Sequence, residues 1–506
     1  MSKSTALITL GVMLSLFMAS MEGTVVATAM PTIVGQLGGL ATYSWVFSVF
    51  LLAATTTVPI FGKLSDLFGP RRVFATAMGL FLIGSLLCGM AQSMPQLIVF
   101  RVVQGLGAGG VLPLAFIIVG ALFTYEQRAR MQGVFSSVWG LSSIVGPLLG
   151  GFLVDQVSWR WVFFVNIPPG LVATAFIWFV WTDDPRPAKV DGRVDYIGAG
   201  LLTAGVVAFL LGLFSLGRPS SWPLLALAVG LFAALVWVER TATDPVLPLP
   251  LFRDRLFAAA TGHGVFAGCA LFGSIAFIPL FVQAVLGTSA TVAGATLTPL
   301  TLAWTGASVV SSRLLLRISA RTLVLIGMSS LTLGMLFMSR IGVHTSLPSL
   351  VFYLMLLGLG MGMSIPVFLI AVQTSAPRYA LGVATSTIQF ARSMGGALGV
   401  SIMGAVLALK LGAARAASGG DPALSSLNRL LDPLARTATS DFVIGPLKDA
   451  LAGAIQSVFV IAFIAAIFGL GASALAPGGR LAQLAAKRAE LEGQTRSGAA
   501  ATSGSD

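Results

Sequence analysis

The sequence predicts an all-α integral membrane protein with fourteen transmembrane helices, arranged as two six-helix bundles and an inserted two-helix hairpin. Three observations predict this fold class: the composition, the spacing of the apolar segments, and the distribution of Lys and Arg. Of the 506 residues, 56% are hydrophobic and 9% are charged, and the mean hydropathy is +0.93. A soluble domain carries about a quarter charged residues. The composition therefore excludes a soluble globule, and the bilayer is the expected solvent for most of the chain.

The apolar segments have the length of membrane-spanning helices, which need about 20 residues to cross a bilayer. The first segment contains Glu22 and is followed by many others, so we do not expect a cleaved signal peptide. The predicted spans are 6–30, 42–61, 73–92, 96–120, 132–154, 161–181, 196–216, 222–238, 257–284, 291–312, 322–339, 348–374, 380–408 and 450–475.

Lys and Arg gather on one side of these spans. Of the 30 basic residues, twenty fall in alternate loops and the tails, eight fall on the other side, and two lie within spans. The positive-inside rule therefore places both termini in the cytoplasm of a multi-pass cell-membrane protein. The same distribution explains the net charge of +12 without a nucleic-acid partner.

Two polar, proline-rich connections divide the chain. Residues 182–195 and 239–256 bracket two spans without ionisable residues, which we interpret as an inserted hairpin. Within the outer loop, 424–438 could form a surface helix or a solvated linker. The predicted organisation is a first bundle at 1–181, a linker with the hairpin (196–216 and 222–238) at 182–256, a second bundle at 257–475 with a long outer loop at 409–449, and a disordered tail at 476–506.

The inner loop after the second span carries a compact motif. Gly62 and Gly69 would permit a tight turn, and Asp66 could pair with Arg71 or Arg72 at the membrane face. This pattern resembles the inner-loop motif of the major facilitator superfamily. The resemblance implies a cytoplasmic gate that locks while a central cavity opens outward. A degenerate copy without the acid at 313–321 fits a duplicated architecture.

The fifth span contains Gly146, Pro147, Gly150 and Gly151. Proline removes a backbone donor and glycines allow close helix approach, so this segment should bend and pack tightly. The motif resembles that of exporters in the same superfamily. Together with segments 22–33 and 159–168 and the inserted hairpin, it resembles the fourteen-span drug:proton antiporter branch of the EmrB/QacA type, over nearly the whole chain. Antiport is implied by this resemblance.

Four ionisable residues lie inside the spans: Glu22, Arg101, Arg392 and His263. A charge at membrane depth costs about 3 kcal/mol or more unless it meets a partner or water, so such residues usually mark a pathway. Glu22 and Arg101 lie at similar depth, and the family fold places their helices side by side. We hypothesise that Glu22, where family members usually have Asp, is the proton-coupling acid and Arg101 its switchable partner. The alternative is a static ion pair.

The remaining polar residues within the spans suggest a substrate cavity lined by Glu22, Gln104, Gln389 and Arg392. Arg392 could instead pair with backbone carbonyls. His263 fits a packing role better than a proton relay. Cys88 and Cys269 fit packing as well, and no metal-spaced cluster is present in the sequence.

The predicted function is proton-coupled export of lipophilic compounds, including cationic drugs, by alternating access. Because two arginines lie within spans, an exporter of an anionic metabolite or lipid is the alternative, followed by a passive facilitator or membrane scaffold. The chain has no Walker-type ATP loop and no catalytic set, so we expect no enzyme activity and no cofactor. The expected partners are a small-molecule substrate, protons and the lipid bilayer, and we expect a monomer.

Overall fold

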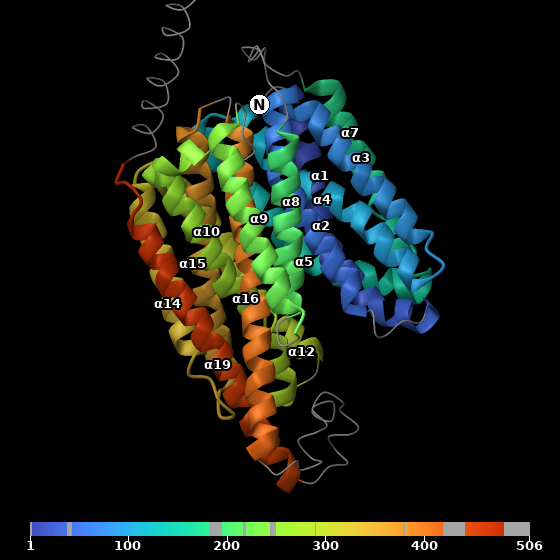
Figure 1. Cartoon of the computed structure of the whole chain (residues 1–506), viewed down its shortest axis with the longest axis vertical. Coiled ribbons are helices and arrows are strands. Elements are labelled where there is room, and N and C mark those ends of the chain that lie inside the picture. The colour runs from blue at the N-terminus through green and yellow to red at the C-terminus, as the bar shows by residue number, and fades with distance from the viewer. Residues whose placement is uncertain are drawn as a thin grey trace, which may run out of the picture.

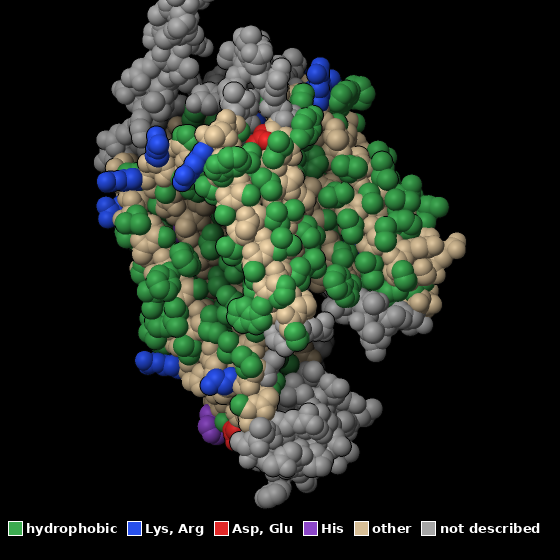
Figure 2. Space-filling model, viewed as in Figure 1, with side chains coloured by type: hydrophobic (Ala, Val, Ile, Leu, Met, Phe, Trp, Pro, Cys, Tyr) green, Lys and Arg blue, Asp and Glu red, His purple; other side chains and the backbone are tan. Residues whose placement is uncertain are grey.

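The computed structural model describes residues 3–37, 43–181, 195–215, 219–242, 249–288, 290–377, 380–417 and 441–479, and all regular secondary structure within them is helical. Twelve helical segments in these ranges are long and apolar enough to cross a membrane. Hydrophobic side chains cover the middle of the face shown in Figure 2, whereas Lys and Arg lie toward its two ends. The chain is therefore a multi-pass membrane protein, and the predicted all-helical class is confirmed.

The first bundle contains five long helices and one broken helix. The break lies at Asn166, two residues before Pro168, and both Pro168 and Pro169 lack the backbone N–H that would continue the hydrogen-bond ladder. The elements are α1 (Lys3–Leu37), α2 (Tyr43–Phe68), α3 (Pro70–Gly89), α4 (Met94–Leu122), α5 (Tyr125–Gln156), α6 (Trp161–Phe164) and α7 (Ile167–Val180).

The second bundle follows a short 3-10 helix, η2 (Leu249–Arg253). Its first helix begins after Asp254, whose carboxylate accepts hydrogen bonds from the N–H groups of Leu256 and Phe257. The elements are α10 (Arg255–Ile275), α11 (Ile278–Leu280), the π-helical turn η3 (Phe281–Val285), α12 (Ala290–Ala295), α13 (Thr298–Leu314), α14 (Ala320–Met338), α15 (Leu347–Ser375), α16 (Leu381–Ala417) and α19 (Asp441–Ala474).

A helical hairpin lies between the two bundles. It consists of α8 (Tyr196–Phe214) and α9 (Ser221–Thr241), and α8 contacts α2 on one side and α16 on the other. Leu202 and Val206 of α8 form an apolar cluster with Met394 and Ala397 of α16. In Figure 1 the hairpin lies in front of the seam between the bundles. It therefore covers that seam on this face of the molecule.

Two predicted spans differ from the twelve candidates. The span predicted at 132–154 falls within α5, a 32-residue helix rich in Gly and Ser that is not among the twelve. The span predicted at 291–312 is split into α12 and α13, and α13 has 17 residues. Both segments are helical, but the count of fourteen spans stays a prediction.

Helical structure extends into the range of the predicted outer loop from both sides. Helix α16 continues to Ala417 and α19 already begins at Asp441, so both ends of the predicted loop 409–449 are helical. The sequence from Leu407 to Ala417 is rich in Ala and Leu, which favour helix even beyond the apolar core. The predicted surface helix at 424–438, the linker residues 182–194 and most of the predicted tail lie outside the described residues.

Candidate functional site

Glu22 and Arg101 meet inside the first bundle. Glu22 lies on α1 with 2% of its surface exposed, and Arg101 lies on α4 with 1% exposed. The Nη1 of Arg101 donates to Oε1 of Glu22, which forms a buried ion pair. Two opposite charges taken out of water are stabilised by such a direct contact, and removing either one leaves the other uncompensated.

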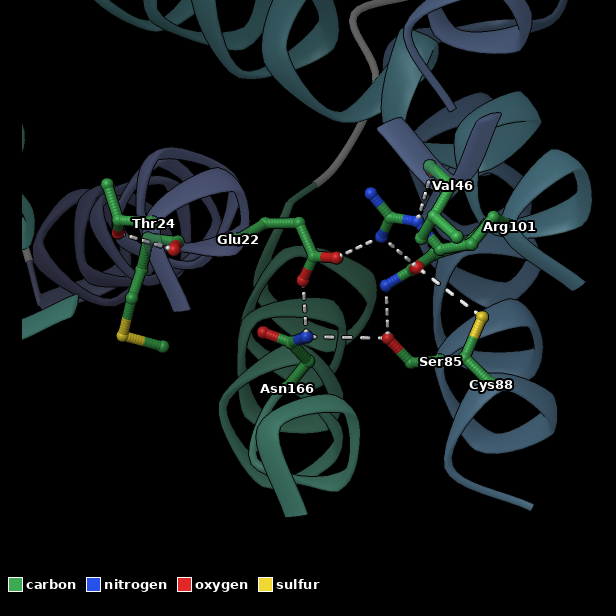
Figure 3. Close-up of polar contacts among 9 residues, drawn as sticks. Glu22, Thr24, Val46, Ser85, Cys88, Arg101 and Asn166 are labelled. Atoms are coloured by element: carbon green, nitrogen blue, oxygen red, sulfur yellow. Dashed lines mark hydrogen bonds and ion pairs between the residues drawn. The ribbon is translucent and has the colours of Figure 1, made fainter. Parts of the chain in front are cut away.

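Amide side chains and a serine complete the surroundings of this pair (Figure 3). Asn166, at the break between α6 and α7, donates from Nδ2 to Oε2 of Glu22 over 2.8 Å. Gln104 accepts from Nη1 of Arg101 over 2.7 Å and donates to the hydroxyl of Ser85 over 2.7 Å. Asn166 also approaches that hydroxyl, at 3.4 Å. Four helical elements therefore contribute side chains to one connected polar network.

Arg101 keeps two contacts that do not depend on Glu22. Its Nε donates to the carbonyl oxygen of Val46 on α2 over 3.2 Å, and its guanidinium lies 4.0 Å from the ring centre of Phe50. A guanidinium over an aromatic face gains electrostatic stabilisation. Arg101 is therefore held on the α2 side of the network, while Glu22 is held on the α1 side.

Glycines bring the helices of this network together. A Cβ atom at Gly84 of α3 would lie 2.4 Å from the backbone of Gln104, so α3 and α4 touch at their backbones. A Cβ atom at Gly146 of α5 would lie 2.1 Å from the hydroxyl of Thr24, two residues after Glu22. Gly146 thus positions α5 against α1 beside the acid. Gly150 is buried, whereas Gly151 has open space around it; the side chain of Pro147 is not among those described.

The loop motif joins the two bundles at one end of the molecule. We call this the gate end: it is where α2 ends and α16 begins. Asp66 accepts hydrogen bonds from the N–H groups of Gly382 and Val383, each over 2.8 Å. These N–H groups belong to the first turn of α16, where the helix dipole favours a negative charge. An acid of the first bundle therefore binds a helix N-terminus of the second.

Gly62 has a different part in this motif from the predicted one. The prediction that it permits the turn is wrong, because Gly62 lies inside α2. A Cβ atom there would lie 2.0 Å from the hydroxyl of Ser386 and 2.9 Å from the carbonyl oxygen of Gly382. Gly69 alone makes the turn, with a φ of 87° that L-residues rarely adopt. Gly62 instead allows α2 to approach α16.

The two arginines of the motif differ in their surroundings. Arg71 is half-buried, and its guanidinium lies 4.7 Å from the ring centre of Trp178 on α7. Arg72 is exposed. The carboxylate oxygens of Asp66 bind the backbone of α16, and the pairing with Arg71 or Arg72 stays a prediction.

Further hydrogen bonds cross between the bundles toward the gate end. Gln373 of α15 donates to the carbonyl oxygen of Phe116 on α4 over 3.0 Å. The hydroxyls of Ser136 on α5 and Ser308 on α13 lie 2.7 Å apart, and both are buried. In Figure 1 the two bundles diverge toward the opposite end. The structure therefore records a state that is closed at the gate end.

The remaining predicted cavity residues lie on α16 of the second bundle. Gln389 is buried, and Arg392 is partly exposed and lines a small cavity with His263 of α10. The four residues predicted to line one cavity thus form two separate groups. Glu22 and Gln104 belong to the buried network, and among the described residues no hydrogen bond connects them with Gln389 or Arg392.

The sequence analysis did not single out three polar residues, two of the Glu22 network and one that joins the bundles. Asn166, Ser85 and Gln373 are uncharged, and such side chains also occur in spans for packing reasons, so polarity alone does not single them out. For Asn166 a signal existed, since it lies two residues before the helix-breaking prolines of the sixth span. A polar side chain at a helix break in a membrane is a frequent feature of transport sites.

Comparison with known proteins identifies the family. The model of the Major Facilitator Superfamily matches residues 12–400. Two relatives come from Bacillus subtilis (strain 168). Multidrug transporter protein MdtP is 39% identical, and the match covers 81% of this chain and 76% of the relative. Multidrug resistance protein 3 is 36% identical, and the match covers 91% of this chain and 93% of the relative. Among solved structures, the human organic anion transporter MFSD10 has a TM-score of 0.61 at 14% identity, covering 91% of this chain and 99% of its own, which shows the fold alone. With the fold and the family model in agreement, the chain belongs to the major facilitator superfamily of membrane transporters.

Proposed function

We propose that this transporter exports lipophilic compounds across the cell membrane in exchange for protons, and that Glu22 carries the proton. The observation that supports this most strongly is the buried ion pair of Glu22 and Arg101. Glu22 is the single acidic residue within the predicted spans, and it lies in the bundle interior and away from lipid. Intramembrane acids placed in this way act as proton relays in pumps and transporters.

The network suggests how a proton could be coupled to movement. A proton that binds Glu22 removes its negative charge, and the charge of Arg101 is then uncompensated in a buried site. Such a loss costs about 3–5 kcal/mol. Arg101 can keep its contacts to Val46 and Phe50 on α2, while protonated Glu22 stays with α1. Protonation therefore favours separation of α1 from α4 and α2, and release of the proton favours their return.

The relatives support the substrate class. MdtP and Multidrug resistance protein 3 carry multidrug names, and a third relative, from the fungus Dothistroma septosporum, is named an efflux pump. With the exporter-like motif at Gly146, this supports export of lipophilic drugs and membership of the fourteen-span branch. Alternating access then requires that the gate end, closed here by Asp66 and its neighbours, opens to admit substrate.

Transport by the purified protein in proteoliposomes tests this proposal. Wild type is expected to pump a lipophilic dye only when a proton gradient is imposed, and Glu22→Gln is expected to lose this gradient-driven transport. The matched control is Asp449→Asn, which removes an exposed carboxylate on α19. Gradient-driven transport by Glu22→Gln at the wild-type rate would contradict the assignment of the proton to Glu22.

A second candidate function is export of an organic anion. One observation favours it: Arg392 lies within the second bundle, where the sequence provides no acidic partner between Asp254 and Asp421.

A further inference from the structure

A small cavity lies in the second bundle, apart from the Glu22 network. Helices α10, α15 and α16 surround it, and its volume is about 10 Å³, which holds about one water-sized atom. His263 is eight residues into α10 and Arg392 eleven residues into α16, so both lie roughly 12–17 Å from the gate end, near mid-membrane. The residues that line the cavity are His263, Gly264, Ala267, Met361, Ile365, Phe368, Ile388 and Arg392.

His263 is held in the cavity wall with an unused hydrogen-bonding atom. Its side chain is 2% exposed, and its ring lies 5.0 Å from the ring centre of Phe368. The Nε2 atom is buried and has no hydrogen-bond partner among the described residues. A neutral imidazole can donate from this nitrogen, and a buried polar atom without a partner costs about 1–3 kcal/mol. An acceptor that reached this nitrogen from the cavity would restore its missing hydrogen bond.

Arg392 brings a positive charge to the same cavity. No Asp or Glu occurs in the sequence between Asp254 and Asp421, a stretch that contains α10 to α16. The intramembrane acid of the first bundle, Glu22, is already bound to Arg101. A guanidinium at membrane depth without an acidic partner is costly, and an anion from outside the protein would compensate its charge.

Close helix packing fixes the two side chains relative to each other. A Cβ atom at Gly268 of α10 would lie 2.4 Å from the carbonyl oxygen of Arg392, and one at Gly395 of α16 would lie 2.0 Å from that of Val265. The backbones of α10 and α16 are thus in contact at the residues next to those that line the cavity. An arrangement preorganised in this way binds an anion without first ordering the side chains.

We propose that Arg392 and His263 form an anion subsite, which accepts the acidic head group of an amphiphilic substrate. Met361, Ile365 and Phe368 of α15 provide the apolar wall for the adjoining hydrocarbon part. The cavity in this state admits one acceptor atom, as a carboxylate oxygen or a chloride ion would supply. This inference rests on the proposed export function and specifies its substrate class as acidic amphiphiles.

Equilibrium binding without any gradient tests the subsite. The probes are dansylaminoundecanoic acid and its uncharged methyl ester, titrated into the purified full-length protein by fluorescence. Wild type is expected to bind the acid more tightly than the ester. Arg392→Gln should weaken binding of the acid by about 10- to 100-fold and leave the ester unchanged. Arg392→Lys should retain part of the preference for the acid over the ester. Arg340→Gln, which changes an exposed arginine, should retain all of this preference.

The histidine has its own pair of variants. His263→Gln keeps a side-chain donor and should bind the acid better than His263→Leu, which has none. If Arg392→Gln fails to fold, Arg392→Lys and this pair still measure the acid-over-ester preference. The inference is overturned if wild type binds acid and ester equally, or if none of these variants changes the preference.

Two further measurements are needed. One distinguishes an inorganic anion from an acidic substrate, and the other distinguishes the anion subsite from proton coupling by Glu22. The titration is repeated in chloride and in gluconate: if chloride at physiological concentration abolishes the preference for the acid, the subsite takes a small inorganic anion and the assignment of substrate class is wrong. Glu22→Gln is expected to bind the acid normally, since it lies in the other bundle. Normal binding with lost gradient-driven transport supports both proposals, whereas gradient-driven transport by Glu22→Gln contradicts only the proposed coupling.

Discussion

Glu22 and Arg101 stabilise each other in a place where water cannot. Arg101→Gln leaves a buried carboxylate without its charged partner, so we expect it to destabilise the protein by about 3–5 kcal/mol. The double variant Glu22→Gln with Arg101→Gln replaces the pair by two neutral amides, and its loss should be clearly smaller than the sum of the single losses. Melting temperatures of the purified variants in detergent measure this.

Additive losses in this double-mutant cycle would show that the two side chains are energetically independent. Such a result would contradict the switchable pair even if Glu22→Gln proved inactive. Arg340→Gln, at an exposed position, provides the baseline for loss of an arginine.

The sequence identified these two residues because charge is rare in apolar segments, and the structure places them in contact. The sequence also suggested Gln104 as a cavity residue because it is polar, and in the structure its side chain is an internal partner of Arg101 and Ser85 without exposed surface. An amide satisfies buried charges and lines cavities equally well. Only the three-dimensional arrangement of α3, α4 and α7 decides between these two uses.

Helix α5 can lie close against α1 because Gly146 has no side chain, and this close approach leaves no room for a larger residue there. A methyl group there would meet Thr24, whose hydroxyl already donates to the carbonyl oxygen of Met21. We expect Gly146→Ala to displace α5 or the Glu22 segment of α1, and to cost about 1–3 kcal/mol of stability together with most of the transport activity.

Gly151→Ala is the matched control, because a Cβ atom at that position has nothing within 4 Å. Both variants replace a glycine in the same helix and gain the same helix propensity, so only the contact with α1 differs. Melting temperature and dye transport are measured for both. Equal behaviour of the two variants would contradict a packing role of Gly146.

The helices themselves were predictable from the length of the apolar segments, but hydropathy alone does not show their interruptions. Hydropathy treats 161–181 and 257–284 as continuous, whereas the structure breaks them near Asn166 and Phe277, each followed by proline. In the opposite sense, α16 extends past its apolar part to Ala417 because alanine-rich sequence keeps forming helix. Apolarity determines where a helix can cross the membrane, and backbone chemistry determines where it begins and ends.

The two bundles are joined by hydrogen bonds toward the gate end and diverge toward the other end (Figure 1). Asp66 was predicted from the sequence to be a gate residue, but its partner, the first turn of α16, was not. Backbone N–H groups carry no sequence signal, since every residue except proline has one. The degenerate second motif at 313–321, without an acid, is consistent with a gate in which one carboxylate meets a helix terminus.

The proposed alternating access requires these contacts to separate in every transport cycle. Ser136 of α5 and Ser308 of α13 provide a test, because their hydroxyl oxygens lie 2.7 Å apart across the bundles. In the variant Ser136→Cys with Ser308→Cys, two thiols take the place of the hydroxyls, and oxidation with copper phenanthroline should join them. The disulfide would hold the gate end closed. We expect transport to stop on oxidation and to return on reduction with dithiothreitol, while mass spectrometry reports the bridge.

The single-cysteine variants control for pairing with Cys88 and Cys269, which are free and buried. Undiminished transport by the fully bridged protein would mean that this contact persists throughout the cycle, and the bundles would then have to exchange access without parting at α5 and α13.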